Sequence, residues 1–221
     1  MSRFILFALV LTPAIAVAQE ECKPLTDASK LPALNKLLDS AKVVASLPAA
    51  DLGGPTEVLL SVMTGATPSA VVMDSVVAKS AMGTAVRDRV LSSLRPDARN
   101  AIPAFRVRVT LGQALGVNAE PSVLCPPRPT TSPGRASFTI VTPAGPPGSV
   151  SRPPRPREIS PRIKIGVNGE VLQVDLGGGT GFADGDRSVR QALEGQRYVP
   201  ALLDGRPVQV WLRDKRVELV R

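Results

Sequence analysis

The sequence predicts an α+β protein made of two small antiparallel sheets, each with a helix, joined by a proline-rich linker. Three observations support this fold class. Residues 162–221 alternate apolar and polar side chains around an Asn-Gly pair. Residues 57–111 show the same order of strand, strand, helix, strand. Between them, the composition changes to proline and arginine. We therefore expect a ββαβ module at 162–221, a degenerate copy of it within 22–125, and a linker over 126–161.

The C-terminal module begins with a predicted hairpin. Its two strands alternate apolar with polar residues, and the Asn168-Gly169 pair between them predicts a two-residue turn. That loop length fixes the expected register, with Val167 opposite Glu170, Ile165 opposite Leu172, Ile163 opposite Val174, Arg162 opposite Asp175 and Lys164 opposite Gln173. One face of the hairpin is then apolar and must be covered.

The following residues supply the rest of the module. Gly177–Gly181 is a flexible connection, and Asp184 or Asp186 is expected to cap a helix that runs to about Arg197. A third strand is predicted from the alternation that starts at Val208, and residues 217 and 219 are expected to prolong it.

The turn before this third strand carries a motif with fixed spacing, Arg197-Tyr198-x-Pro200-Ala201-x-x-Asp204-Gly205-x-Pro207-Val208. Together with the hairpin at 167–171, it resembles the C-terminal domain of TonB-type energy transducers. The resemblance covers roughly the last quarter of the chain. The family usually has a Tyr-Pro segment and a short helix before the hairpin, whereas this chain has Pro153–Arg157 there, which indicates a truncated domain.

The resemblance implies a periplasmic protein in energy transduction, whose C-terminal domain binds the plug-side N-terminal segment of TonB-dependent outer-membrane receptors. An antiparallel sheet with an open edge can accept such a segment as an extra strand. We expect this at Val208–Leu219, with partner-binding residues Val208, Gln209, Val210, Trp211, Leu212 and Arg213. Trp211 is expected to contact a partner or a second copy in a homodimer, or else to be buried in the core. The alternative function is a non-energised envelope scaffold or assembly protein.

Residues 1–18 read as a secretory signal, with Arg3, an apolar run and a small-residue cleavage site at Ala16–Ala18. Cleavage predicts a periplasmic protein. An uncleaved anchor in the inner membrane is the alternative, and only then would an inner-membrane motor be a partner.

Cys22 and Cys125 are the only cysteines of the sequence. In an exported chain two cysteines usually pair, so we expect a disulfide that closes the domain at 22–125. Their spacing is far from the Cys-x-x-Cys of a redox-active pair.

Inside this domain, the sequence predicts a helix over Leu31–Leu47 and then the elements of the degenerate copy. These are strands over Glu57–Val62 and Ala70–Val77, a helix over Thr84–Arg95 and a strand over Pro103–Leu111. When the chain is shifted by about 103 positions on itself, Val62 falls on Ile165, Val71 on Val174 and Val86 on Val189.

Eleven of the 22 prolines lie between residues 126 and 161, with five arginines, which predicts an extended linker. At about 3.1 Å per residue it could span on the order of 100 Å, as the spacer of TonB-type proteins does. A simple interdomain tether is the alternative.

Enzymatic function is not expected. The chain has no histidine, which excludes Ser-His-Asp and Cys-His catalysis and most zinc and haem sites. The glycines at 177–181 are not followed by the Lys-Ser/Thr pair of a phosphate loop, and Asp175, Asp184, Asp186 and Asp204 do not have EF-hand spacing. We expect no cofactor and no metal. Much of the net charge of +8 lies in the linker, so we expect no nucleic-acid partner.

Overall fold

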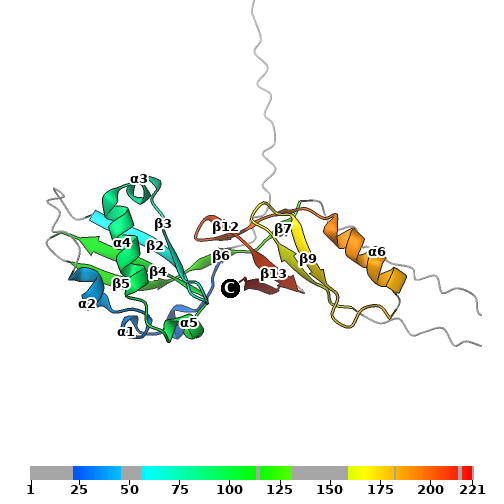
Figure 1. Cartoon of the computed structure of the whole chain (residues 1–221), viewed down its shortest axis with the longest axis horizontal. Helices are drawn as coiled ribbons and strands as arrows, with labels where there is room; N and C mark the ends of the chain where they lie inside the picture. Colours follow the sequence, from blue (N-terminus) through cyan, green and yellow to red (C-terminus); the bar gives the residue numbers. More distant parts are fainter. Residues whose placement is uncertain are drawn as a thin grey trace, which may run out of the picture.

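The computed structural model describes residues 22–45, 56–112, 115–130, 159–181, 183–213 and 216–220. This part of the chain is mixed α+β with antiparallel sheets, as predicted. Figure 1 shows an N-terminal module with α1–α5 and β2–β5 beside a C-terminal module with β8, β9 and α6, with β6 and β12 between them.

The N-terminal module is a four-stranded antiparallel sheet in the order β3-β2-β4-β5. Its strands are β2 (Thr56–Met63), β3 (Ser69–Val72), β4 (Ala104–Leu111) and β5 (Gly116–Pro121). The predicted strands at Glu57–Val62 and Pro103–Leu111 are therefore confirmed. The strand predicted over Ala70–Val77 ends at Val72, because the Asp74 carboxylate accepts hydrogen bonds from the amides of Val76 and Val77 and starts a helix.

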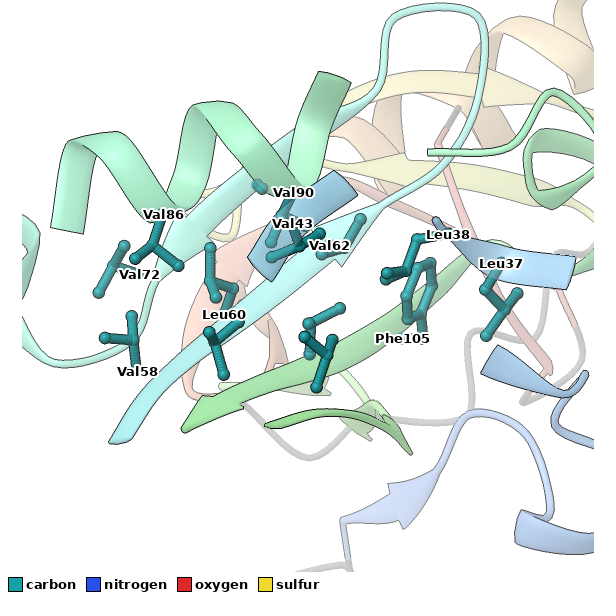
Figure 2. Close-up of a cluster of buried hydrophobic side chains, with 14 of the residues drawn as sticks. Leu37, Leu38, Val43, Val58, Leu60, Val62, Val72, Val86, Val90 and Phe105 are labelled. Carbon is teal, nitrogen blue, oxygen red and sulfur yellow. The ribbon is translucent and has the colours of Figure 1, made fainter. Parts of the chain in front are cut away.

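Three helices connect β3 to β4, namely α3 (Ser75–Ala78), α4 (Ala81–Ser92) and α5 (Ala98–Ala101). The predicted helix over Thr84–Arg95 thus begins earlier, where the Ser80 hydroxyl accepts from the Gly83 amide. Figure 2 shows Val86 and Val90 of α4 pointing at the apolar side chains of β2 and β4. Phe105 is the largest fully buried side chain, so the core is mainly aliphatic.

The single helix predicted over Leu31–Leu47 is wrong. The structure has two short helices, α1 (Leu34–Leu37) and α2 (Ser40–Val44), after a 3-10 turn at Ala28–Lys30. Leu38 between them is extended, with φ −152°, and pairs with Leu94. Leu37 and Leu38 are both fully buried. In a continuous helix these two consecutive side chains would point in different directions, whereas the extended backbone at Leu38 breaks the helix. Asp39 then caps α2 through the Lys42 amide.

The C-terminal module is also a four-stranded antiparallel sheet, in the order β14-β13-β8-β9. Its elements are β8 (Arg162–Ile165), β9 (Val171–Asp175), α6 (Ala183–Glu194), β13 (Val210–Arg213) and β14 (Arg216–Leu219). Val189 and Leu193 of α6 pack on the apolar face of the sheet. Residues 217 and 219 do not prolong the third strand, because they belong to a fourth strand that runs back along it.

Asp184 and Asp186 lie inside the first turn of α6, and neither caps it as predicted. The Asp186 carboxylate instead accepts from the Thr180 amide at 2.6 Å and the Thr180 hydroxyl at 2.7 Å. The first of these bonds is the main reason that the pKa of Asp186 lies below its ordinary value.

The predicted Asn168-Gly169 turn differs in type. Gly169 alone has a positive φ, at 82°, and its amide donates to the carbonyl of Gly166, as in a turn with a glycine bulge. The register is as predicted for Arg162, Ile163 and Lys164, but Ile165 pairs with Val171, and Leu172 is left 47% exposed.

A contact distant in sequence fixes this turn. The Tyr198 amide donates to the Gly169 carbonyl at 2.9 Å, and a Cβ at position 169 would collide with the Tyr198 carbonyl oxygen. Because the backbone at Tyr198 comes this close, only glycine fits at position 169.

Both modules share one strand order. When the four strands of each are numbered along the chain, each sheet reads 2-1-3-4, with its long helix between strands 2 and 3. Val62 and Ile165 are both fully buried in the first strand, and Val86 and Val189 are both buried in the helix. Val71 does not match Val174, because it is not part of the core, and the neighbouring Val72 is buried instead.

A third sheet joins the modules, in the order β1-β6-β11-β12. The N-terminal part contributes β1 (Lys23–Pro24) and β6 (Val123–Cys125), and the C-terminal part contributes β11 (Ala201–Leu203) and β12 (Arg206–Val208). Next to it, β7 (Arg128–Pro129) pairs with β10 (Tyr198–Val199).

The predicted linker therefore does not hold the modules about 100 Å apart. Residues 126–130 follow β6 and continue into pairing with the C-terminal module, where the Thr130 amide donates to the Arg197 carbonyl. Residues 131–158 lie outside the described residues, as does the predicted signal at 1–18.

The predicted disulfide is present and joins Cys22 to Cys125. It fastens the start of the described chain to the end of β6, beside the joining sheet. None of the helices in the described ranges is long and apolar enough to cross a membrane.

Replacing both cysteines by serine should lower the free energy of unfolding by about 4–5 kcal/mol, because the bond closes a loop of 103 residues. Urea unfolding of the oxidised wild type and the double variant measures this. A loss below about 1 kcal/mol would contradict it and would mean that the unfolded chain keeps these two segments close without the bond.

Candidate functional site: the module junction and the sheet edges

The motif residues of the C-terminal module lie in the module core and at the junction between the two modules. Tyr198 and Ala201 are buried in the C-terminal core, and Pro200 separates β10 from β11. The Tyr198 hydroxyl donates to Gln196, and burial raises the pKa of this phenol. Asp204 and Gly205 form the turn between β11 and β12.

This turn has the two-residue geometry that the sequence predicted for Asn168-Gly169. Asp204 and Gly205 both have positive φ, 50° and 80°, and Leu203 faces Arg206 across the turn. In such a hairpin the pair that closes the turn, Leu203 and Arg206, is hydrogen-bonded, and the next pair, Leu202 and Pro207, is not. The nitrogen of Pro207 therefore points away from β11. Proline therefore costs no ladder bond there and removes a donor from the edge of β12.

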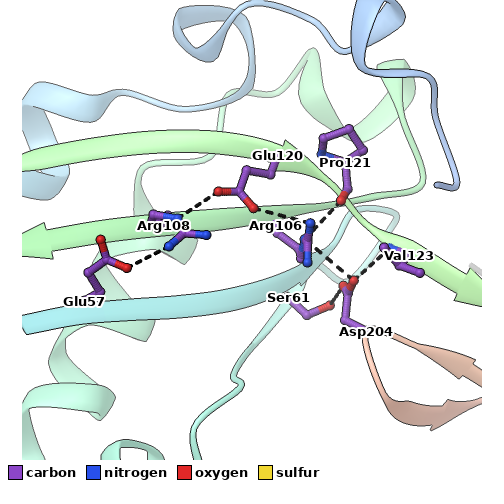
Figure 3. Close-up of polar contacts among 8 residues, drawn as sticks. All are labelled: Glu57, Ser61, Arg106, Arg108, Glu120, Pro121, Val123 and Asp204. Carbon is purple, nitrogen blue, oxygen red and sulfur yellow. Dashed lines mark hydrogen bonds and ion pairs between the residues drawn. The ribbon is translucent and has the colours of Figure 1, made fainter.

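The Asp204 side chain anchors the turn to the N-terminal module, as Figure 3 shows. One carboxylate oxygen accepts from the Ser61 hydroxyl of β2 at 2.6 Å, and the other accepts from the Val123 amide of β6 at 2.8 Å. The Asp204 amide returns a bond to the Val123 carbonyl. Arg106 lies 3.9 Å from this carboxylate, whose side chain is 0% exposed, so the buried charge has an opposite charge nearby.

Arg106 links Asp204 to a row of charges across the outer face of the N-terminal sheet. Glu120 bridges Arg106 at 3.3 Å and Arg108 at 2.8 Å, and Arg108 also reaches Glu57 at 2.7 Å. The hydrogen bond from Arg108 is the main cause that lowers the pKa of Glu120, and burial opposes it. The same bonds raise the pKa of Arg108.

An apolar cluster lies beside this polar centre and also belongs to both modules. Ala104, Leu124 and Leu203 form its buried part. Partly buried side chains surround them, namely Leu25, Met63, Val208, Val217 and Leu219. A cleft of about 350 Å³ lies between the hairpin β11–β12 and the outer face of β2 and β3.

The strand predicted to bind partners is not an open edge. Residues 208–213 end β12 and form β13, and β13 pairs with β14 on one side and with β8 on the other. The open edge expected within Val208–Leu219 is therefore not on β13, because residues 216–219 form β14 and pair along it. Partner binding through residues 208–213 stays a prediction. Val210 is fully buried, and the Gln209 carbonyl accepts from the Val220 amide.

Trp211 lies on the polar face of the C-terminal sheet and is partly buried. The Arg162 guanidinium sits over its ring, 4.5 Å from the centroid, and also bonds Glu218 at 2.7 Å. Trp211 is therefore held by neighbours on β8 and β14, outside the apolar core.

Among the described residues, β14 and β9 are the edge strands of the C-terminal sheet. The bond from the Val220 amide to the Gln209 carbonyl shows which residue pairs of the β13–β14 ladder are hydrogen-bonded. Bonded and non-bonded pairs alternate in an antiparallel ladder, so the amides and carbonyls of Val217 and Leu219 point outward from β14. Within the described part of the chain, no backbone group outside the sheet bonds these outward groups.

The four aspartates that could have met as a cation site do not converge. Asp175 and Asp186 line a cleft of about 360 Å³ beside Gly177–Gly179, whereas Asp204 is bonded at the junction. Within the described ranges, no group of acidic or cysteine side chains is arranged to hold a metal ion.

Comparison with known proteins returned no match, whether to a protein-family model, to a curated protein or to a solved structure.

Asp204→Ala should lower the free energy of unfolding by about 2–4 kcal/mol, because it leaves the Ser61 hydroxyl and the Val123 amide without their buried acceptor. Asp184→Ala, at an exposed aspartate, is the matched control and should cost less than about 0.5 kcal/mol. Urea unfolding compares the two, and equal losses would contradict the anchoring role.

Glu120 should make stability depend on acid pH. Folding lowers the pKa of this carboxyl, so its charged form stabilises the fold at pH values above its unfolded pKa of about 4.3. This stabilisation is lost as the pH falls through the pKa of the folded state. The free energy of unfolding should therefore fall more steeply for wild type than for Glu120→Gln between about pH 5 and pH 2. Parallel pH profiles of the two proteins would refute this.

Proposed function

We propose that this chain is an exported, TonB-like binding protein without enzymatic activity, which captures an extended segment of a partner by strand addition at the outer edge of β14. The observation that carries the proposal is the open row of backbone groups at Val217 and Leu219. An arriving strand can pair with these groups without breaking any bond of the sheet.

The position of β14 favours binding at this edge. Val217 and Leu219 pack their side chains both on the C-terminal core and on the apolar cluster of the junction. Two modules thus hold one strand, and a backbone held in its binding conformation loses little entropy when a partner pairs with it. The resemblance makes a segment of an outer-membrane receptor the first candidate partner, with another envelope protein or a second copy of the chain as alternatives.

The proposed compartment is the periplasm. A disulfide that closes a long loop is typical of oxidising compartments, and the leader-like residues 1–18 fit export. Coupling to an inner-membrane motor would require that this leader is retained, which mass spectrometry of the mature N-terminus measures directly.

One observation favours the second candidate, a non-energised envelope scaffold. The pairing of β6 with β11 docks the two modules on each other, so the described residues before 131 and after 158 belong to one assembly. A spacer that spans the periplasm would need the modules apart. We therefore favour a local binding role over long-range transduction, and we interpret the shared 2-1-3-4 strand order as a degenerate internal repeat.

Val217→Pro tests strand addition at β14. Proline removes an outward amide that the sheet does not use, so the protein should fold while binding weakens at least about tenfold. The probes are synthetic peptides that copy the plug-side N-terminal segments of outer-membrane receptors from the source organism, measured by fluorescence anisotropy.

Val217→Ala is the matched control, since it trims the same side chain and keeps the amide. It should bind within about threefold of wild type. A folded Val217→Pro protein that binds like Val217→Ala would exclude this edge. Sedimentation of the same proteins without peptide shows whether a second copy uses the edge instead.

A further inference from the structure

The three other edge strands of the two modules, β3, β5 and β9, share one feature. On each, an arginine donates to a backbone carbonyl near the free edge. Arg206 bonds the Val72 carbonyl of β3 at 2.8 Å, Arg106 bonds the Pro121 carbonyl of β5 at 3.0 Å, and Arg190 bonds the Val174 carbonyl of β9 at 2.6 Å.

The ladders show that the carbonyls of Val72 and Val174 point outward from their sheets. The Met73 amide bonds the Leu59 carbonyl, so the next pair, Leu60 and Val72, is a non-bonded pair and Val72 faces away from β2. The same alternation can be followed from the bond of Val220 across β13 and β8 to β9. It makes Val174 and Ile163 a non-bonded pair, so Val174 faces away from β8. Both carbonyls are therefore groups that an added strand would use.

A guanidinium on such a carbonyl obstructs strand addition in two ways. It occupies an acceptor that the arriving backbone amide needs, and it places a charged, bulky group along the edge. Helices add to this, because α4 packs by β3, α2 by β5 and α6 by β9. The bonds of these three arginines go to β5, β9 and β3, and none of the three donates to β14.

We propose that Arg106, Arg190 and Arg206 are edge-capping arginines that confine strand addition to β14. This inference rests on the proposed function for the partner that β14 accepts. Arg190 gives the cleanest test, because its bond to the Val174 carbonyl lies away from the junction, whereas Arg106 and Arg206 lie at the junction.

Arg190→Gln should open β9 and allow two copies to pair through it, as an exposed edge does. We expect the dimer dissociation constant from sedimentation velocity to fall about tenfold relative to wild type, the size expected for one charge-assisted bond. Hydrogen exchange at the Val174 amide should slow as protein concentration rises. Arg187→Gln is the matched control, since Arg187 is exposed on the same helix and pairs only with Asp184 among the described residues.

Circular dichroism checks that the variant is folded, and Arg190→Met, which keeps an unbranched apolar stem without the guanidinium, replaces it if it is not. A folded variant that stays as monomeric as Arg187→Gln, with unchanged exchange at Val174, overturns the inference. The assay needs no partner, so it separates the two proposals. Self-association of Arg190→Gln without any peptide binding at β14 would support the capping role and remove the proposed function.

Discussion

The arrangement of this molecule depends on one buried carboxylate. Asp204 sits at the tip of a C-terminal hairpin, and its two strongest partners, Ser61 and Val123, belong to the N-terminal module. A buried carboxylate is costly unless donors surround it, so only one docking of the hairpin satisfies it. That docking places β11 beside β6 and Leu203 in the apolar cluster, and β14 then lies against both modules. The candidate binding edge is thus positioned by a contact remote from it.

The parts of the fold that were predicted are those with strict local periodicity. Ile163, Val174, Phe105 and Val109 alternate with polar neighbours, and all four are buried in their strands. The failures occurred where a distant contact decides the local structure. Leu38 breaks the helix predicted over Leu31–Leu47 because it pairs with Leu94, and the turn at Gly169 takes its shape from Tyr198. Neither partner is visible from residues near the turn or the helix.

The site was predicted less well than the fold. The motif pointed to Asp204 and Pro207. The role of Asp204 depends on Ser61, which is 143 positions away, and the role of Pro207 depends on which pairs of the β11–β12 ladder are hydrogen-bonded. The open edge was assigned to Val208–Leu219 because residues 217 and 219 were expected to prolong one strand, whereas residues 216–219 form a second strand that pairs with the first. The capping arginines could not be found from sequence, because which carbonyls face outward is set by pairing across the sheet.

The joining sheet also has a consequence for how the chain is made. Its four strands come from residues 23–24, 123–125, 201–203 and 206–208, so it draws on nearly the whole described length. A chain is synthesised from its N-terminus, so β6 has no partner at β11 until residues 201–203 have been made. Until then the edge of β6 that pairs with β11 stays uncovered. A chaperone would protect the chain most during this interval.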